Sequence, residues 1–291
     1  MLDELRHLLL IVEHGTFTEA ARRAHLSQPA LTASIRRLEL ALGARLLSRG
    51  RTGAELTAAG EALLPRARAA LAAVDEGRRV VEEVVGLHAG EVRLGAGATA
   101  CTYFLPPVLA AFRSRHPGVR LLLREAFTDQ LEAALDAGEL DLAVITAGDR
   151  PPPGPFDRWR DDELIAVAAP GVDPVRAGWI TFAAGSPTRA VLLARVPGAD
   201  IVMELGSIAA VMANAAAGIG LALVSRTAVA ADLSAGALVE VRRPWTPVTR
   251  RLAVRHRGLA RLAPAAAALR ELLLESSMVA ATPGRRRARS R

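Results

Sequence analysis

The sequence of 291 residues contains no lysine, so all 37 of its basic side chains are arginines. This absence excludes enzymes that hold a phosphate with the lysine of a glycine-rich loop or form a Schiff base on lysine. The segment GAGATA at residues 95–100 also lacks the full spacing of a nucleotide-binding loop. No pair of nucleophile and base stands out. We therefore expect a protein that is not an enzyme.

Cysteine and long apolar runs are equally scarce. Cys101 is the single cysteine, which excludes an internal disulfide. The apolar run at residues 8–12 is too short for an export signal and is followed by Glu13 and His14. No segment is long enough to span a bilayer, so we expect a cytoplasmic protein with no membrane partner. The six histidines are scattered without ligand spacing, so we expect no metal site and no cofactor.

The most informative stretch is a pair of predicted helices near the N-terminus. Thr16 and Glu19 have the spacing of a capping box, which predicts a helix from Phe17 to about Ala24. Ser27 is placed to cap a second helix that reaches about Leu42 and tolerates a proline in its first turn. Apolar residues at spacings of three and four predict one shared buried face, which consists of Ala20, Ala21, Leu26, Leu31, Ile35, Leu38 and Leu42. The pattern predicts a helix-turn-helix.

If that face is buried, the start of the second helix is left to contact bases in a DNA major groove. Gln28 suits adenine, whereas Pro29 or the methyl group of Thr32 suits a thymine methyl. Arg36 projects from the same part of the helix as these residues, whereas the other arginines of the set given below are placed to bind phosphates. The predicted DNA-binding set is Thr16, Arg22, Arg23, Ser27, Gln28, Pro29, Thr32, Ala33, Arg36, Arg37, Arg49 and Arg51. The alternative is an ordinary helical pair with solvated arginines.

These residues also carry a family resemblance. The segment LDELRHLLLIVEHGTFTEAARRAHLSQPALTASIRRLELALGARLLSRGRTGAELTAAGEALL closely resembles the DNA-binding domain of LysR-type transcriptional regulators. The family often has a polar or basic residue where this chain has Ala33. The resemblance implies a bacterial, nucleoid-associated regulator. Within residues 46–56, two glycines between apolar flanks predict the hairpin wing of a winged helix-turn-helix.

A long helix should follow the wing, from Ala58 to about Leu87. Its apolar positions repeat at three and four, as in a coiled coil, and are Leu64, Ala67, Leu71, Val74, Val81 and Val85. Arg78 interrupts this seam and Pro65 is expected to kink the helix. We expect the helix to form a dimer. The alternative is that it packs on its own domain.

Beyond residue 90 the predicted strands and helices alternate in a βαβαβ pattern that begins with a strand from Glu91 to Ala96. This pattern indicates a parallel sheet that binds ligands at the carboxyl ends of its strands. Motifs including GEVRLGAGAT, GELDLAVI and MELGSIAAVMANAAAGIGLALVS resemble the LysR effector domain, which has two lobes like a periplasmic binding protein. The predicted fold class is thus α+β and multidomain. Its parts are a DNA-binding domain at 1–57, a linker helix at 58–89, an effector domain at 90–276 and a basic disordered tail at 277–291. Lobe I is expected at 90–163 and 258–276, and lobe II at 164–257.

Hydroxyl groups mark the ends of several predicted strands in this domain. Helix N-termini attract anions, and Arg189 could add a bidentate clamp on a carboxylate or phosphate. By resemblance the same positions line the effector site, so a small anionic metabolite is expected. The predicted set is Thr99, Thr102, Thr128, Thr146, Gly185, Ser186, Thr188 and Arg189. For any single threonine, helix capping is an equally good explanation. Cys101 is expected to line the pocket rather than to act as a redox sensor.

The sequence as a whole predicts a LysR-type regulator that binds double-stranded DNA and a small effector. The family resemblance implies a homodimer or homotetramer that acts on RNA polymerase. A solute-binding protein or an α/β enzyme without a DNA role is the alternative, but neither explains the N-terminal helices.

Overall fold

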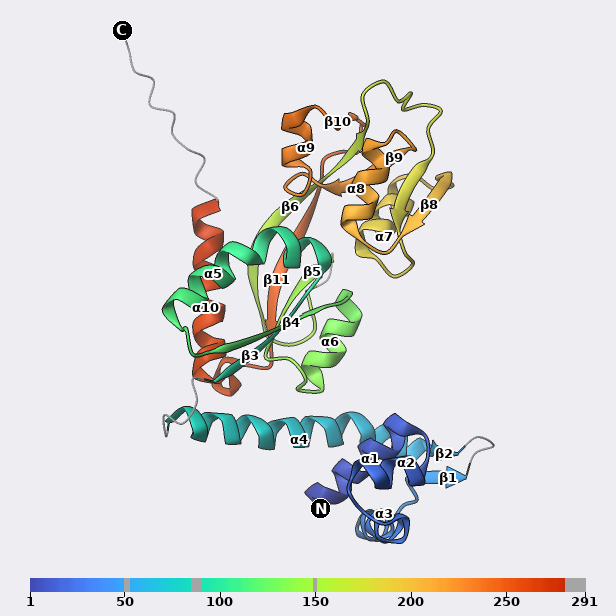
Figure 1. Cartoon of the computed structure of the whole chain (residues 1–291), viewed down its shortest axis with the longest axis vertical. Coiled ribbons are helices and arrows are strands. Elements are labelled where there is room, and N and C mark those ends of the chain that lie inside the picture. The colour runs from blue at the N-terminus through green and yellow to red at the C-terminus, as the bar shows by residue number, and fades with distance from the viewer. Residues whose placement is uncertain (50–52, 85–89, 149–150, 281–291) are drawn as a thin grey trace. The chain divides into compact units, whose positions relative to one another are not determined.

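The computed structural model describes residues 1–49, 53–84, 90–148 and 151–280, which divide into two compact units (Figure 1). The first unit is essentially residues 1–84, and the second contains nearly all of the later residues. Among the helices in these ranges, none is long and apolar enough to cross a membrane.

The first unit is a helix-turn-helix with a wing and a long final helix. Its elements are α1 (Leu2–His14), α2 (Phe17–Arg23), α3 (Gln28–Leu42), β1 (Leu47–Arg49), β2 (Ala54–Leu56) and α4 (Ala58–Val84). Both predicted helix caps are confirmed: Thr16 Oγ1 accepts from the Glu19 amide at 3.3 Å, and Ser27 Oγ accepts from the Ala30 amide at 3.3 Å. The turn between the two helices includes His25, whose φ of 55° is left-handed.

The shared apolar face of α2 and α3 is buried as predicted over most of its length. Leu31, Ile35 and Leu38 are inaccessible or nearly so and pack with residues of α1 and α2. The prediction was wrong for Leu42, which is 44% exposed because it lies at the last turn of α3, beyond the helices that cover the rest of the face. Leu26, in the turn, is also exposed in part. On α1 the buried stripe includes Ile11, which was not predicted from the sequence.

The wing is held against α3 and α4 by short contacts. Glu39 Oε1 accepts from the amides of Leu46 and Leu47, at 2.8 and 3.2 Å, so the carboxylate orders the chain between α3 and the hairpin. Gly60, in the first turn of α4, lies so close to the wing that a Cβ atom there would be 2.2 Å from the Leu46 carbonyl oxygen. Strands β1 and β2 pair antiparallel, which confirms the predicted hairpin, while residues 50–52 at its turn lie outside the described residues.

The long helix α4 differs from the predicted seam in its first half. Ala67 and Leu71 are buried in the chain's own hydrophobic core together with residues of α1 to α3. Packing on its own domain is therefore correct for this half, because α1 already covers the stripe there. Val81, in the second half, is 61% exposed, and Val85 lies outside the described residues.

The second unit alternates strands and helices. The strands are β3 (Glu91–Ala96), β4 (Arg120–Glu125), β5 (Leu142–Ala147), β6 (Phe156–Ala168), β7 (Trp179–Phe182), β8 (Ile201–Leu205), β9 (Leu221–Ser225), β10 (Val239–Glu240) and β11 (Val248–His256). The helices are a π-helical turn η1 (Ala100–Phe104), α5 (Leu105–Arg115), α6 (Thr128–Asp136), α7 (Pro187–Arg195), α8 (Ile208–Ala216), α9 (Ala230–Ala235), the 3₁₀ turn η2 (Leu259–Arg261) and α10 (Pro264–Ala280). The short elements α9 and β10 were not predicted.

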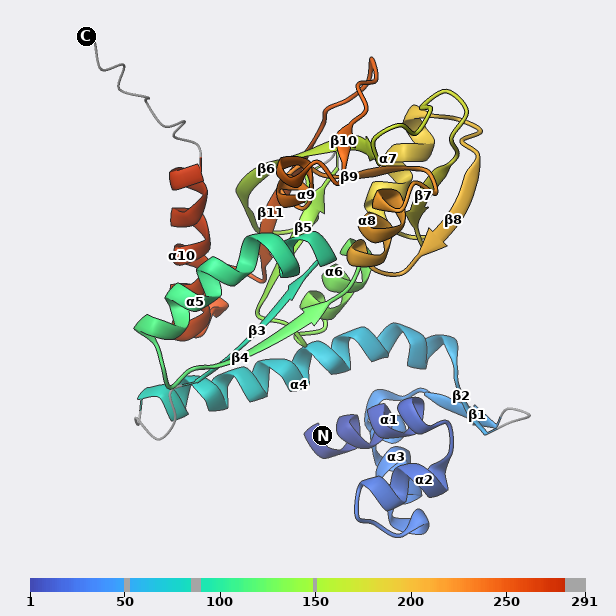
Figure 2. The same cartoon turned by 45° about the horizontal axis from the view of Figure 1, so that its top comes forward.

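Among the described residues these strands form one nine-stranded sheet, in the order β4-β3-β5-β11-β6-β9-β7-β8, with β10 beside β6. The predicted parallel pairing is confirmed for β3 with β4 and β5, and for β7 with β8 and β9. Strands β6 and β11 are instead antiparallel to their neighbours, and Figures 1 and 2 show this pair side by side through the middle of the unit. They join a first lobe around β3 to β5 with a second lobe around β7 to β9.

Alternate residues of each central strand face different helices, as the twofold period of a strand requires. Leu142 and Val144 pack under α5 and α10, whereas Ala143 and Ile145 pack against α6. Residues 164–168 of β6 are buried on both faces by the helices of the second lobe. The central strands of the sheet are thus covered by helices on both faces.

Two predicted boundaries differ from the structure. Residues 251–256 of β11 pair with β5, so the chain returns to the first lobe before residue 258. Helix α10 continues to Ala280, so residues 277–280 are helical rather than part of a disordered tail. Residues 281–291 lie outside the described residues.

Candidate nucleic-acid interface and ligand pocket

The start of α3 is the candidate nucleic-acid interface. Gln28, Pro29, Ala33 and Arg36 are all exposed, as are both capping residues that precede the two helices of the motif. Thr32 is half-buried, and its hydroxyl donates to the Gln28 carbonyl oxygen at 2.9 Å, so it is already bonded within the helix. His7 Nδ1 lies 2.7 Å from Ser34 Oγ on the buried side, which ties α3 to α1. The predicted contact face is therefore free and rigidly supported.

The arginines predicted to bind phosphates are not equally available. Arg22 and Arg23 both bind the Glu19 carboxylate, with Nε to Oε distances of 3.0 and 3.3 Å. Glu19 was expected to bond back to the Thr16 amide, but the two arginines have bound its carboxylate instead. The hydrogen bond from Arg22 is the main reason that the pKa of Glu19 is lowered to about 2.

The other arginines of the set fall into three groups. Arg37 Nε is 3.3 Å from Glu4 Oε1, so its charge is partly balanced. Within the described residues Arg36 has no ion-pair partner. Arg49 belongs to β1, but its side chain, like the whole of Arg51, lies outside what the structure describes.

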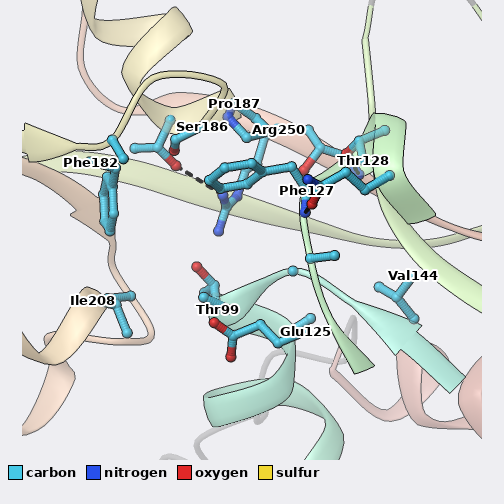
Figure 3. Close-up of a pocket in the computed structure, with 18 of the residues that line it drawn as sticks. Thr99, Glu125, Phe127, Thr128, Val144, Phe182, Ser186, Pro187, Ile208 and Arg250 are labelled. Carbon is cyan, nitrogen blue, oxygen red and sulfur yellow. Dashed lines mark hydrogen bonds between the residues drawn. The ribbon is translucent and has the colours of Figure 1, made fainter. Parts of the chain in front are cut away.

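The second candidate site is a cavity of about 290 Å³ in the second unit (Figure 3). It lies where the predicted carboxyl ends of the strands meet, so its walls come from the segments that follow β3, β4, β5, β7 and β8 and from β11. The residues that line it are Gly97, Ala98, Thr99, Ala100, Glu125, Ala126, Phe127, Thr128, Gln130, Val144, Thr146, Phe182, Ala183, Ser186, Pro187, Thr188, Leu205, Gly206, Ile208, Arg250 and Leu252. The volume is near the lower end of the range, about 300 to 1,000 Å³, of pockets that hold small molecules.

Five of the eight predicted effector-binding residues line this cavity: Thr99, Thr128, Thr146, Ser186 and Thr188. Thr128 Oγ1 accepts from the Thr146 amide at 3.4 Å, which joins the ends of two neighbouring segments. The prediction was wrong for Thr102, which is exposed and outside the lining because the π-helical turn rotates it away. Gly185 is also outside the lining, although a Cβ atom there would be 3.4 Å from the ring of Phe127.

Arg189 was predicted as an anion clamp, and its side chain is engaged elsewhere. Its Nη1 donates to the Phe182 carbonyl oxygen at 3.1 Å, and its Nη2 is 2.6 Å from Glu204 Oε1. The hydrogen bond to Glu204 raises the pKa of Arg189, so the guanidinium stays charged and bound to strand β8. Arg189 does not line the cavity, because at this point of α7 its side chain faces the neighbouring strands.

Arg250 provides the guanidinium of the cavity and was not predicted from the sequence. Its Nε is 2.7 Å from Oδ2 of Asp162, whose side chain is only 1% exposed, and its Nη1 is 3.2 Å from Thr188 Oγ1. Asp162 also accepts from Ser225 Oγ at 2.7 Å, so three strands and α7 meet in one polar network. No local pattern could have identified this pair, because the two residues are 88 positions apart.

Helix N-termini give the cavity its electrostatic character. Helices α6, α7 and α8 and the turn η1 all begin beside it. The first-turn amides of a helix and the positive end of its dipole favour negative charge, although in α8 the Ala210 amide already donates to Ser207 Oγ. Ser186 precedes α7 and is nearly buried, yet its hydroxyl does not cap that helix, so it remains available to a ligand. These features favour an anionic group near Arg250 and Ser186.

The remaining walls are mostly apolar and carry one carboxylate. Figure 3 shows Phe182 and Ile208 on one side of the cavity, with Arg250 and Glu125 on opposing sides. Glu125 is the last residue of β4 and Phe127 comes two residues later, so the rule that placed Thr128 at a strand end could have found them. Cys101 does not line the cavity, contrary to expectation. Burial, with a smaller effect of Glu125, raises the pKa of its thiol to about 11, which disfavours a reactive thiolate.

Two family descriptions match the chain. "Bacterial regulatory helix-turn-helix protein, lysR family" matches residues 2–61, and "LysR substrate binding domain" matches residues 86–277. The first match covers the candidate nucleic-acid interface, and the second covers the whole ligand cavity.

Relatives of similar length support the same assignment. The chain is 33% identical over 260 residues to a "Probable RuBisCO transcriptional regulator" of Gracilaria tenuistipitata var. liui, covering 81% of this chain and 84% of the relative. It is 32% identical over 294 residues to "HTH-type transcriptional regulator CbbR" of Xanthobacter flavus, covering 94% and 86%.

Solved structures share the fold. CbnR, a LysR family transcriptional regulator, has a TM-score of 0.68 at 22% identity and covers 95% of this chain and 99% of its own. ArgP from Mycobacterium tuberculosis has a TM-score of 0.70 at 20% identity and covers 94% and 96%. With both domain types matched over almost the full length, the chain belongs to the LysR family of transcriptional regulators.

Proposed function

We propose that this regulator reads its operator with the first half of α3 and responds to a small carboxylate-bearing metabolite held in the cavity. The observation that supports operator recognition is the exposed face at the capped start of α3, which lies opposite the buried apolar face of the same helix. A recognition helix requires this arrangement, because its N-terminal residues must reach base edges while the other face packs on the domain. One solved relative, CbnR, has been crystallised with its target DNA.

Within this interface the residues have separate roles. Gln28 and Pro29 contact base edges. Arg36 was predicted together with them, but it has no ion-pair partner among the described residues, and we assign it to a phosphate instead. Arg22, Arg23 and Arg37 exchange their intramolecular carboxylates for phosphates on DNA, at some cost in free energy. Thr16 and Ser27 add hydroxyl contacts near the helix starts, while Thr32 and Ala33 contact bases with methyl groups. Arg49 and Arg51 place further positive charge at the wing.

The proposed division of the chain follows the predicted domains. Residues 1–57 bind DNA, residues 58–89 connect and dimerise, and the later residues bind the effector. Since Ala67 and Leu71 are used within the chain's own core, we place the dimer contact on the second half of α4, around the exposed Val81. Two dimers forming a tetramer would read half-sites spaced by whole helical turns and act on RNA polymerase in the cytoplasm.

Effector control requires that the ligand bind two arrangements of the protein with different affinity. The cavity is suited to this role because its walls come from both lobes, joined by β6 and β11. The hydroxyls of Ser186 and Thr188, together with Arg250 and the start of α7, supply donors for a carboxylate. A change in the closure of the lobes would then alter how the dimers are arranged on DNA.

The test is to capture genomic DNA fragments with the purified full chain at near-physiological salt, where non-specific binding is weak. We expect a few enriched sites with dyad symmetry. Gln28→Ala should relax preference at one base pair, at a cost of about 1 to 3 kcal/mol, and Arg36→Ala should weaken binding to all sites alike. Leu40→Ala, at an exposed position late in the same helix, serves as the matched control. Binding without enrichment that simply fades with salt would contradict sequence-specific recognition.

A further inference from the structure

The charged groups of the cavity are arranged as an opposed pair. Among the described residues that line it, Glu125 and Arg250 are the ionisable ones. Figure 3 shows them on opposite sides of the cavity, with Thr99 beside Glu125 and Ser186 and Pro187 beside Arg250. A ligand in this space therefore meets an acidic group at one end and a basic group at the other.

The charge of Arg250 is already balanced inside the protein. Its guanidinium contacts the buried carboxylate of Asp162 at 2.7 Å through both Nε and Nη2. The pair contributes no net charge, but it fixes the remaining N–H groups of Arg250 in the cavity. These N–H groups, the free hydroxyl of Ser186 and the first turn of α7 form a donor site for a carboxylate.

Glu125 is not balanced in this way. Within the described part of the chain it has no ion-pair partner, and it lies at the end of β4 with its side chain exposed. A ligand that carried only a carboxylate would bring a second negative charge into the cavity beside Glu125, which would keep only water as its partner. A ligand with an ammonium group at that end would instead satisfy it, and Thr99 would accept a further hydrogen bond.

We propose that the effector is a zwitterion, namely an α-amino acid with an apolar side chain. Its carboxylate binds Arg250, Ser186 and the start of α7, and its ammonium binds Glu125 and Thr99. The apolar side chain lies against Phe127, Phe182 and Ile208, and the cavity of about 290 Å³ is of a size for a small metabolite of this kind. This inference rests on the proposed function of the cavity as the effector site.

The experiment uses the full chain and titration calorimetry. Each of the common protein amino acids is titrated, and so are acetate, as a simple carboxylate, and inorganic phosphate. Each amino acid that binds is compared with the same acid lacking its α-amine and with its carboxamide, which lacks the carboxylate. At least one apolar amino acid should bind, and both analogues should bind at least about tenfold more weakly, as expected when a charge-assisted hydrogen bond is lost. Saturation with that amino acid should change the affinity for the selected operator.

The decisive variant is Glu125→Gln. This substitution should lower the affinity for the amino acid by about tenfold or more. The affinity for the acid that lacks the α-amine should stay the same or rise. Glu91→Gln is the matched control, because Glu91 begins β3, lies outside the cavity lining and pairs with Arg120 at 3.5 Å. It should leave all affinities unchanged.

The outcomes separate this inference from the proposed function. Binding of simple carboxylates or phosphate but of no amino acid would overturn the zwitterion and keep the effector site. The zwitterion would also be overturned if Glu125→Gln lost the same affinity for the amino acid and for the acid that lacks its α-amine. If no compound of either class binds, the effector site fails as well, whereas sequence-specific DNA binding is tested independently by fragment capture.

Discussion

Removing the buried carboxylate of Asp162 should strongly destabilise the second unit. The side chain of Asp162 is 1% exposed and that of Arg250 is 10% exposed, and they are 2.7 Å apart. In Asp162→Ala the guanidinium would remain buried without its counter-ion, and Ser225 would lose its acceptor. Breaking one partner of a buried ion pair costs about 3 to 5 kcal/mol, or about 6 to 20 °C in Tm for a domain of this size.

Tryptophan fluorescence is a suitable assay, because Trp159, Trp179 and Trp245 are the three tryptophans of the chain and all lie in the second unit. Unfolding in urea followed by this signal reports on that unit without interference from the DNA-binding domain. The slope against urea should stay constant while the midpoint falls.

The neighbouring residue offers a matched control. Asp161 is 43% exposed and pairs with Arg158 at 2.7 Å on the surface, so Asp161→Ala should cost less than about 1 kcal/mol. Replacing both partners, as Asp162→Leu with Arg250→Met, should restore much of the stability because no charge is then left buried. The reasoning is refuted if Asp162→Ala costs no more than Asp161→Ala, or if the double replacement is no more stable than the single one.

Three further predictions concern the DNA-binding unit. The pKa of Glu19 is about 2, so its carboxylate is ionised at neutral pH and holds two arginines. Glu19→Gln should free both arginines, raise the affinity for DNA and steepen the salt dependence of binding, as measured by fluorescence anisotropy. An unchanged salt dependence would contradict this. His25 has a left-handed φ of 55°, a conformation that asparagine adopts more readily. His25→Asn should therefore raise the free energy of unfolding by about 0.5 to 1 kcal/mol, measured by thermal unfolding followed by circular dichroism. A lower free energy of unfolding would argue against backbone strain at residue 25. Gly60→Ala should destabilise this unit by about 1 to 3 kcal/mol and weaken DNA binding, because its Cβ would lie 2.2 Å from the Leu46 carbonyl oxygen. Gly77→Ala is the control, because Gly77 lies in the same helix with open space around it, and this change should instead stabilise α4 by up to about 1 kcal/mol. Similar effects of the two substitutions would disprove the argument that a Cβ at residue 60 is too close to the wing.

Local physics explains what the sequence by itself determined. The caps at Thr16 and Ser27 bond to amides three residues ahead, so their spacing alone places the starts of α2 and α3. Strand β3 was predicted at its observed bounds, Glu91–Ala96, because apolar periodicity and strand propensity act within a few residues. The family and the regulatory function followed from such motifs.

The tertiary structure decided where charges and apolar stripes find their partners. Arg189 and Arg250 look equally available in the sequence, yet one binds Glu204 on a neighbouring strand and the other faces the cavity beside Asp162. Similarly, the stripe of α4 resembles a dimer seam throughout, but Leu71 is buried by the chain's own first helices.

The physical reason is that these interactions join residues far apart in sequence, whose approach depends on the order and direction of the strands. Asp162 and Arg250 are 88 positions apart and meet because β6 and β11 pair antiparallel through the middle of the sheet. Short-range spacing contains no information about that pairing. The sequence thus determined the local elements and the family, while the long-range topology decided which side chains line the cavity of the second unit.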